Sequence, residues 1–301
     1  MSTAPRPEAP SVPTAEVPAP AELLRIAESA AAEAADYLRS LDRDHISREY
    51  KTSSQDIVTE HDRASEEIIV AALRRELPGC RIVGEEGGER SADDDAPGSG
   101  DPADVVTFYV DPIDGTSNFA SGLPLFCVSI GIAVGEELVA GVIDAPILGE
   151  VFTAADGPMM VNGVPVEPRA TRPARDALVL SGFPGHRISR ELPEQAGRMN
   201  IAVHEEFSAV RHLGTAALEL AYVAAGRADA TALASINAWD IAAGFHLLTR
   251  AGGSLRTWPG TGPADRPDHL RPAYAACTGP ERLELLDTLL DEVQALRDAR
   301  V

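Results

Sequence analysis

Two aspartates, Asp111 and Asp114, stand within the stretch YVDPIDGTSNF, directly after an apolar run. Two carboxylates this close along the chain repel each other unless a cation lies between them. Hard carboxylate oxygens select magnesium or manganese over zinc. Because Pro112 removes an N–H group and fixes φ, the chain can turn there and aim the Ile113 carbonyl at the same ion. The pattern therefore indicates a divalent-cation site.

The next three residues, Gly115, Thr116 and Ser117, can open a helix whose free N–H groups point at an anion. A cation site beside an anion cradle indicates a phosphate ester. Other phosphate chemistries lack their motifs. D-P-I-D is one residue longer than the D-x-D of aspartate-nucleophile phosphatases, and the single lysine, Lys51, is not part of a P-loop. Neither G-x-S-x-G nor H-E-x-x-H occurs.

The composition argues against several partners. The formal net charge is −21 over 301 residues and no basic stripe is visible, so we expect no nucleic acid partner. No run approaches the length of a bilayer span and no secretory signal is visible, which predicts a cytoplasmic protein with no membrane partner. Cys80, Cys127 and Cys277 lie far apart without C-x-x-C spacing. They are expected to be small buried thiols rather than disulfide partners or zinc ligands.

The first third of the chain predicts a tail, two helices and a loop. Residues 1–20 are rich in proline and alanine and are expected to be a disordered tail. Apolar residues at three- and four-residue steps predict a helix from Leu23 to Leu41, and Thr59 is expected to cap a second helix. Residues 87–104, which include three adjacent aspartates, are expected to form an exposed loop.

Strand and helix patterns then alternate to the end of the chain. VVTFYV predicts a buried strand that ends at Asp111, with further strands and helices after it. A helix is expected near 189–202, and a final leucine-rich helix from Pro280. Strands mixed with helices throughout predict an α/β (α+β) protein. We expect an N-terminal α+β part, residues 21–170, and a C-terminal α/β part, residues 171–301.

These motifs carry a family resemblance. DPIDGTSNF together with WDIAAGFHLLTRAGG resembles the paired signatures of the inositol monophosphatase family, which are magnesium-dependent, lithium-sensitive phosphomonoesterases. KTSSQDIVTEHD, IVGEE, the NG pair at 162–163 and GTAALELAYVAAG are also similar to the family pattern, in family order, over roughly residues 21–295. The resemblance implies a layered α/β/α/β/α sandwich of the inositol monophosphatase and fructose-1,6-bisphosphatase type, and a homodimer.

The resemblance also implies a set of metal ligands. Glu85, Asp111 and the Ile113 carbonyl would bind a first magnesium ion, and Asp111, Asp114 and Asp240 would bind a second. Glu85 would also hold a third, weaker ion through waters. Manganese would be able to substitute for magnesium.

Catalytic and substrate-binding residues follow from the same resemblance. Asp62 and Thr116 would orient and deprotonate the attacking water, and Glu85 would act beside them through its ion. Water would attack in line without a phosphoenzyme, because no residue stands as a poised nucleophile. The backbone of Gly115, Thr116 and Ser117 would hold the phosphate oxygens. The residues near the alcohol part of the substrate would be Gly214, Thr215 and Ala216.

Each of these residues has a plainer interpretation. Asp62 lies three residues after Thr59, so it could be only the acid of a capping box, and Asp240 near the start of its own helix has the same explanation. Glu85 and Lys51 could be surface charges. The ordered set of motifs favours the functional interpretation.

Several substrates fit the resemblance. The leading candidate is a small polyol phosphate, either inositol 1-phosphate or a related cyclitol or sugar phosphate. The alternatives are histidinol phosphate, a 3′-phosphoadenosine nucleotide, or no reaction at all in a metal-binding or ligand-binding protein that keeps the fold. One residue departs from the family pattern: Leu233 stands seven residues before Asp240, where inositol monophosphatases usually carry a glutamate that accepts hydrogen bonds from substrate hydroxyls.

Overall fold

The structure is a computed structural model that describes residues 17–43, 46, 49–50, 57–91 and 102–299. Most of the expected tail, the centre of the expected loop at 87–104, and Lys51 lie outside these residues. Among the helices of the described ranges, none is long and apolar enough to cross a membrane.

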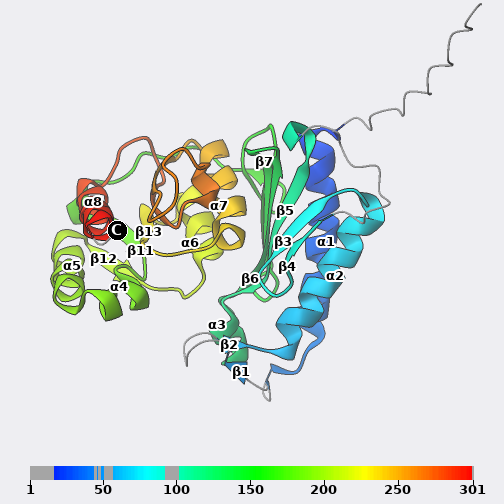
Figure 1. The fold of residues 1–301 in the computed structure, drawn as a ribbon, viewed down its shortest axis with the longest axis horizontal. Helices are drawn as coiled ribbons and strands as arrows, with labels where there is room; N and C mark the ends of the chain where they lie inside the picture. The colour runs from blue at the N-terminus through cyan, green and yellow to red at the C-terminus, as the bar shows by residue number, and fades with distance from the viewer. Residues whose placement is uncertain (1–16, 44–45, 47–48, 51–56, 92–101, 300–301) are drawn as a thin grey trace, which may run out of the picture.

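Two helices form the first layer, α1 (Pro20–Ser40) and α2 (Glu60–Glu76). They cover one face of the larger sheet (Figure 1). The predicted apolar stripe of α1 is buried, and Thr59 caps α2 as predicted, accepting from the His61 N–H at 3.2 Å. Helical spacing of apolar residues thus buries one side of each helix against the sheet.

An eight-stranded sheet forms the second layer, in the order β10-β9-β8-β7-β6-β5-β3-β4. β3 and β5 are parallel, and the other neighbours are antiparallel. A separate antiparallel pair is formed by β1 and β2. The bounds are β1 Glu49–Tyr50, β2 Ile57–Val58, β3 Arg81–Gly84, β4 Gly88–Arg90, β5 Val106–Asp114, β6 Cys127–Val134, β7 Glu137–Ala145, β8 Glu150–Ala154, β9 Met160–Val161 and β10 Val164–Pro165.

A bulge in β5 sets the direction of two aspartates. Asp111 pairs with Ser129 and Asp114 with Cys127, so three steps along β5 oppose two steps along β6. Side chains of a regular strand alternate between its faces, so residues three apart would point opposite ways. One extra residue restores the phase and lets both carboxylates point to one side. The strand therefore continues through Pro112 to Asp114, where the sequence predicted its end at Asp111.

The third layer consists of α6 (Ala216–Ala224) and α7 (Ala238–Arg250), which lie between the two sheets (Figure 1). Glycines let α7 approach the first sheet closely. A Cβ atom at Gly131 of β6 would lie 2.5 Å from the Ala242 Cβ, and one at Gly141 of β7 would lie 2.9 Å from the Ala243 Cα. Both distances are well inside ordinary carbon contact. The close approach brings the first turn of α7, with Asp240, next to β5.

A five-stranded sheet, β12-β11-β13-β15-β14, forms the fourth layer. β11 is parallel to β12 and β13, whereas β15 is antiparallel to β13 and β14. The far face is covered by α4, α5 and α8 (Figure 1). The bounds are β11 Leu178–Leu180, β12 Ala209–Arg211, β13 Ala230–Leu233, β14 Ser254–Trp258, β15 Ala273–Cys277, α4 Gly185–Glu191, α5 Pro193–Glu206 and α8 Glu284–Asp298.

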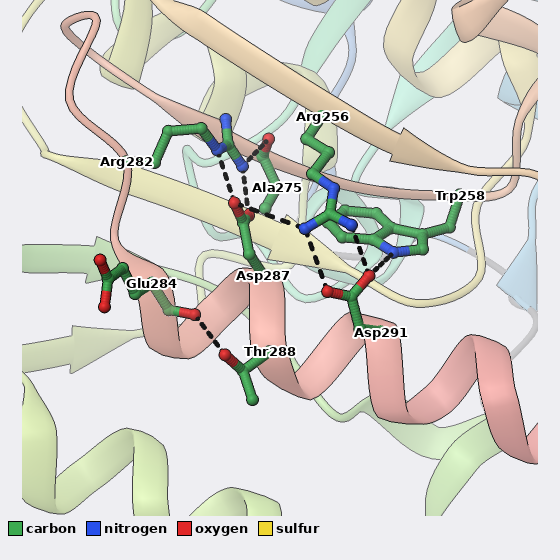
Figure 2. Close-up of polar contacts among 8 residues, drawn as sticks. All are labelled: Arg256, Trp258, Ala275, Arg282, Glu284, Asp287, Thr288 and Asp291. Atoms are coloured by element: carbon green, nitrogen blue, oxygen red, sulfur yellow. Dashed lines mark hydrogen bonds and ion pairs between the residues drawn. The ribbon is translucent and has the colours of Figure 1, made fainter.

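Ion pairs as well as apolar contacts dock α8 onto this sheet (Figure 2). Asp287 accepts hydrogen bonds from the guanidinium of Arg282. Arg256 pairs with Asp291 and lies over the Trp258 ring, 4.6 Å from its centroid. The Trp258 indole also donates to Asp291 at 2.8 Å. These groups fix the angle of α8 against β14 and β15.

The layers run helix, sheet, helix, sheet, helix, which confirms the expected α/β/α/β/α sandwich. The helix predicted near 189–202 is wrong in extent: α4 ends before Leu192 and α5 begins at Pro193, because proline cannot donate to the preceding turn. The last helix begins at Glu284 rather than Pro280, because Leu283 before it has an extended backbone, with φ −90° and ψ 96°.

Two other expectations concern the chain between the elements. Part of the loop predicted at 87–104 is a strand, because Gly88–Arg90 pairs with β3. The first sheet ends at Pro165 and the second begins at Leu178, with the expected division at 170/171 between them. Separate folding of the two parts stays a prediction. Cys80, Cys127 and Cys277 are free and buried, as predicted.

Candidate active site

Three aspartates predicted to bind metal come together. One carboxylate oxygen from each of Asp111, Asp114 and Asp240 lies within 4.8 Å of the others. Asp111 and Asp114, at the bulged end of β5, are 1% and 7% exposed, and Asp240 lies in the first turn of α7. Carboxylate oxygens at this separation fit a hard divalent cation such as Mg²⁺ or Mn²⁺.

Burial raises the pKa of all three carboxyl groups, and the charges of neighbouring carboxylates raise it further at Asp111 and Asp240. Burial is the main cause of a pKa of about 6 at Asp114 and of about 8 at Asp240. The pKa of Asp111 is raised well above its usual range by burial first, and then by the charges of Glu85, Asp114 and Asp240. A cation among them would oppose the repulsion and favour the ionised forms. The electrostatics therefore agree with the ligand geometry.

Helix N-termini hold two of these aspartates. The Asp114 Oδ2 accepts from the Thr215 hydroxyl and from the Ala217 N–H, both at 2.6 Å. The Asp240 Oδ2 accepts from the Asn237 N–H at 2.9 Å, as the reciprocal cap of α7. A carboxylate has two oxygens, so capping and metal binding by Asp240 are compatible.

Asp62 and Thr116, the predicted catalytic pair, are in direct contact. The Thr116 Oγ1 lies 2.9 Å from the Asp62 Oδ1 and 3.0 Å from the Ile113 carbonyl oxygen. The other Asp62 oxygen accepts from the N–H and the hydroxyl of Thr59 at 2.7 and 2.6 Å. Asp62 is fully buried. The capping box therefore exists, and it aims the second oxygen of Asp62 at Thr116.

Glu85 follows β3, beside the end of β5. Its N–H donates to the Val110 carbonyl at 3.2 Å, next to Asp111. Its charge raises the pKa of both Asp111 and Asp240, which places the carboxylate near the three aspartates. The structure therefore brings Glu85 to the predicted site.

Glu66, on α2, is a residue that the sequence reasoning missed. It is 1% exposed and accepts from the N–H groups of Glu86 and Gly87, both at 2.8 Å. A Cβ atom at Gly84 would lie 2.5 Å from its carboxylate, so glycine makes room for it. Glu66 thus fixes the loop that carries Glu85. The available signal was its spacing, since it lies four residues after Asp62 on the same helix face.

Two glycine-containing motifs predicted to contact substrate also meet. Gly115 has φ 95° and caps α3 (Thr116–Ala120). A Cβ atom there would lie 3.3 Å from the Thr215 Cβ and 3.4 Å from the Gly214 carbonyl oxygen. Gly115 is therefore required both for its backbone conformation and for this close approach.

The remaining predicted residues are placed differently. The Ala216 N–H contributes to the hydrogen bonding of Asp114. Ser117 is exposed, in the first turn of α3. Leu233 is the last residue of β13 and is partly buried against the apolar residues between the sheets. Lys51 lies outside the described residues.

Four helices begin at this site and contribute Asp62, Thr116, Ala217 and Asp240, from α2, α3, α6 and α7 respectively. The first turn of a helix carries free N–H groups and a partial positive charge. The site therefore combines carboxylates that suit cations with the start of α3, which has no side-chain cap and whose first N–H groups suit an anion. This combination fits a phosphate ester held together with divalent cations.

Comparison with known proteins agrees with this chemistry. The model of the inositol monophosphatase family matches residues 19–295. The chain belongs to the inositol monophosphatase family. As a member it is a phosphoric monoester hydrolase of a metal-dependent family, and Asp111, Asp114 and Asp240 are a donor set that could hold the metal.

Two proteins that are similar to this inositol monophosphatase family member have different names. It is 36% identical over 241 residues to the Nus factor SuhB of Pseudomonas aeruginosa, covering 79% of this chain and 86% of the relative. It is 33% identical over 245 residues to the inositol monophosphatase of Dictyostelium discoideum, covering 81% and 85%. The structure of inositol monophosphatase from Anabaena (Nostoc) matches with a TM-score of 0.68 and 28% identity, covering 93% of this chain and 96% of that one.

Stabilisation by Mg²⁺ should increase with pH. A carboxyl group whose folded pKa is raised stabilises the metal-free fold below its unfolded pKa, near 4, and this contribution is lost as pH rises through the folded pKa. That loss runs from about pH 4 to about pH 6 for Asp114 and from about pH 4 to about pH 8 for Asp240, so Asp240 carries most of it above pH 6. We therefore expect the metal-free Tm to fall from pH 5.5 to 8.5, and the Tm increase caused by saturating Mg²⁺ to be larger at pH 8.5.

Differential scanning fluorimetry of chelator-treated protein, with NaCl at matched ionic strength as control, measures both values. An equal Tm increase at the two pH values would mean that these carboxylates do not bind the added ion.

Proposed function

We propose that this chain is a Mg²⁺-dependent phosphomonoesterase that hydrolyses a small polyol phosphate, with inositol 1-phosphate or a related cyclitol or sugar phosphate as the substrate class. The observation that carries the proposal is the group Asp111, Asp114 and Asp240 beside the contact between Asp62 and Thr116. A binding protein would have no need to join a cation site to a buried acid and hydroxyl pair.

The bound metal and the residues of the site would have different roles in the reaction. Bound Mg²⁺ would supply Lewis-acid stabilisation of the phosphoryl group and lower the pKa of water. The Thr116 hydroxyl has one proton and donates it to Asp62 or to the Ile113 carbonyl, which leaves its lone pairs free to orient a water molecule. Asp62 then accepts the proton of that water through Thr116. The first N–H groups of α3 would bind phosphate oxygens.

The substrate is the open part of the proposal. A panel of inositol 1-phosphate, other cyclitol and sugar phosphates, histidinol phosphate and 3′-phosphoadenosine 5′-phosphate, each with Mg²⁺, tests it by phosphate release. Highest kcat/KM for a polyol phosphate supports the proposal. Preference for histidinol phosphate or the nucleotide would replace the substrate class and keep the reaction. A homodimer and inhibition by lithium stay predictions of the family resemblance, and a cytoplasmic location stays a prediction of the sequence.

Leu233 should weaken the use of inositol 1-phosphate. A leucine accepts no hydrogen bond, and a substrate hydroxyl left unpaired in a closed site loses about 1–3 kcal/mol, or about 5- to 150-fold in affinity or rate. Ser235 and Asn237 lie on the following segment and could supply part of what is missing. We expect another polyol, sugar or aminocyclitol phosphate to be the better substrate. We also expect Leu233→Glu to raise kcat/KM for inositol 1-phosphate.

Steady-state kinetics of both proteins on the same panel check this expectation. Efficient hydrolysis of inositol 1-phosphate by the wild type, with no gain from the glutamate, would show that Leu233 does not determine selectivity.

A further inference from the structure

A short turn, Leu213–Thr215, joins β12 to α6 and is held from two sides. The Asn118 side-chain amide, on α3, donates to the Leu213 carbonyl at 2.8 Å and to the Leu125 carbonyl at 2.6 Å. On the other side, the Leu213 N–H donates to the Glu219 Oε1 of α6 at 2.9 Å. The side chains of Asn118 and Glu219 thus hydrogen-bond the carbonyl and the N–H of Leu213, respectively, and they come from different halves of the chain.

The burial of the Glu219 carboxyl group at this position costs free energy. Its side chain is 1% exposed between the two sheets, and burial raises its pKa to about 7. Hydrogen bonds from the backbone of Leu213 and Gly214 oppose that rise. The Thr231 hydroxyl lies 3.4 Å from its other oxygen. Burying a carboxyl group costs free energy unless it is well paired, and the pairs that it makes here are chiefly with the turn.

The turn leads directly to a predicted metal ligand. Thr215, its last residue, donates its hydroxyl to the Asp114 Oδ2 at 2.6 Å, and the Ala217 N–H donates to the same oxygen at 2.6 Å. Asp114 in turn lies within the group that includes Asp111 and Asp240. A hydrogen bond this short tolerates little displacement, so the position of the turn determines the orientation of Asp114.

We propose that Glu219 is a positioning residue for the phosphatase site: it holds the Leu213–Thr215 turn against Asn118, so that Thr215 and the start of α6 keep Asp114 oriented for a divalent cation. The proposal rests on the proposed function. Partners that orient a ligand typically change metal affinity or activity by about 10- to 100-fold when removed.

Calorimetric titration with Mn²⁺ on the full chain tests this without requiring turnover. Glu219→Leu removes the acceptor of the Leu213 N–H, and we expect the Mn²⁺ Kd to rise about tenfold or more. Glu219→Gln keeps an oxygen acceptor of the same length, so its Kd should stay within about threefold of wild type. Kinetics should follow: Glu219→Leu needs a higher Mg²⁺ concentration for half-maximal activity, whereas Glu219→Gln does not.

A double variant tests the route through Thr215. If Glu219 acts through the Thr215 hydroxyl, Glu219→Leu with Thr215→Val should bind Mn²⁺ within about twofold of Thr215→Val alone. Additive losses would overturn this route. Asp229→Asn is the matched control, because Asp229 is also a buried acid that accepts a backbone N–H, from Leu178 at 2.7 Å. It should lower Tm and leave the Kd unchanged.

Two results would overturn the proposal: a wild-type Mn²⁺ Kd in Glu219→Leu, or the same change in Kd in Asp229→Asn. Should Glu219→Leu fail to fold, Asn118→Ala loosens the turn from its other side and is expected to raise the Kd; an unchanged Kd there also overturns the proposal. Failure of the proposed function is separate, since it would appear as a wild type that binds Mn²⁺ and releases no phosphate.

Discussion

Asp111→Asn is expected to lower kcat/KM for every phosphate ester by about 10³-fold or more and to leave the fold intact. A carboxylate that lies among Asp114, Asp240 and the charge of Glu85 supplies negative charge that an amide does not. Loss of metal-based stabilisation of the transition state costs several kcal/mol, and each 1.36 kcal/mol is about a factor of ten.

The fold should survive because the amide keeps the local hydrogen bond and removes repulsion. The Asp111 Oδ1 accepts from the Ile113 N–H at 3.0 Å, and the oxygen of asparagine can do the same. We therefore expect the metal-free variant to have a Tm equal to or above that of the wild type. Activity and stability should move in opposite directions, and thermal unfolding with steady-state kinetics measures both.

Asp144→Asn is the matched control for this variant. Asp144 lies on β7 of the same sheet and is 5% exposed, and burial raises its pKa to about 6. The nearby charges that act on it belong to Arg39 and Asp36 of α1. It should keep wild-type activity. Turnover by Asp111→Asn within about threefold of wild type would show that the metal assignment is wrong.

Asp62→Asn is expected to reduce kcat by about 10²- to 10⁴-fold, the range of one general acid or base. The single oxygen of asparagine can continue to accept from Thr59, which keeps the cap of α2. Its NH₂ group would then face the Thr116 hydroxyl and donate where Asp62 accepts. Affinity for Mn²⁺ should change little, because the metal ligands remain.

Two variants of Thr116 separate chemistry from folding in the same test. Thr116→Val removes the hydroxyl at nearly constant volume and should lose kcat to a similar extent as Asp62→Asn. Thr116→Ser keeps the hydroxyl and should retain most of the activity. Equal rates for the valine and serine variants would refute a role of the contact between Asp62 and Thr116 in proton transfer.

Local sequence patterns were enough to predict the residues that start α2. Thr59 and Asp62, three residues apart, predicted a capping box, and the structure contains it. The second oxygen of Asp62 was not predictable in this way, because it faces Thr116, which is 54 residues further along the chain. A capping box is a local motif, whereas the direction of the remaining oxygen depends on how α2 packs against β5.

The cation site shows the same limit. The D-P-I-D spacing indicated two carboxylates, but a regular strand would have separated them onto opposite faces. Only the pairing of Asp111 with Ser129 and of Asp114 with Cys127 reveals the extra residue that brings them together. The third carboxylate, that of Asp240, lies close to the other two because Gly131 and its neighbours on the sheet leave room for α7 to pack closely. That tertiary contact left no periodic signal in the sequence.

Some errors could have been avoided and others could not. Pro193 lies inside the helix predicted near 189–202, and its missing N–H was a visible reason to end one helix and begin another. Asn118 gave no comparable warning, and the only signal for Glu66 was its spacing from Asp62. Each hydrogen-bonds backbone groups of a distant segment, so their roles depend on contacts that only the folded chain creates.

Phosphate release by chelator-treated wild type, titrated with Mg²⁺ on a generic phosphate ester, tests the central claim most directly. We expect the metal-free chain to be inactive. Turnover should return as Mg²⁺ is added and binds to the carboxylates of Asp111, Asp114 and Asp240. Phosphate release that is not inhibited by lithium would contradict only the expected binding of one of the ions. Full activity in excess EDTA would contradict the mechanism.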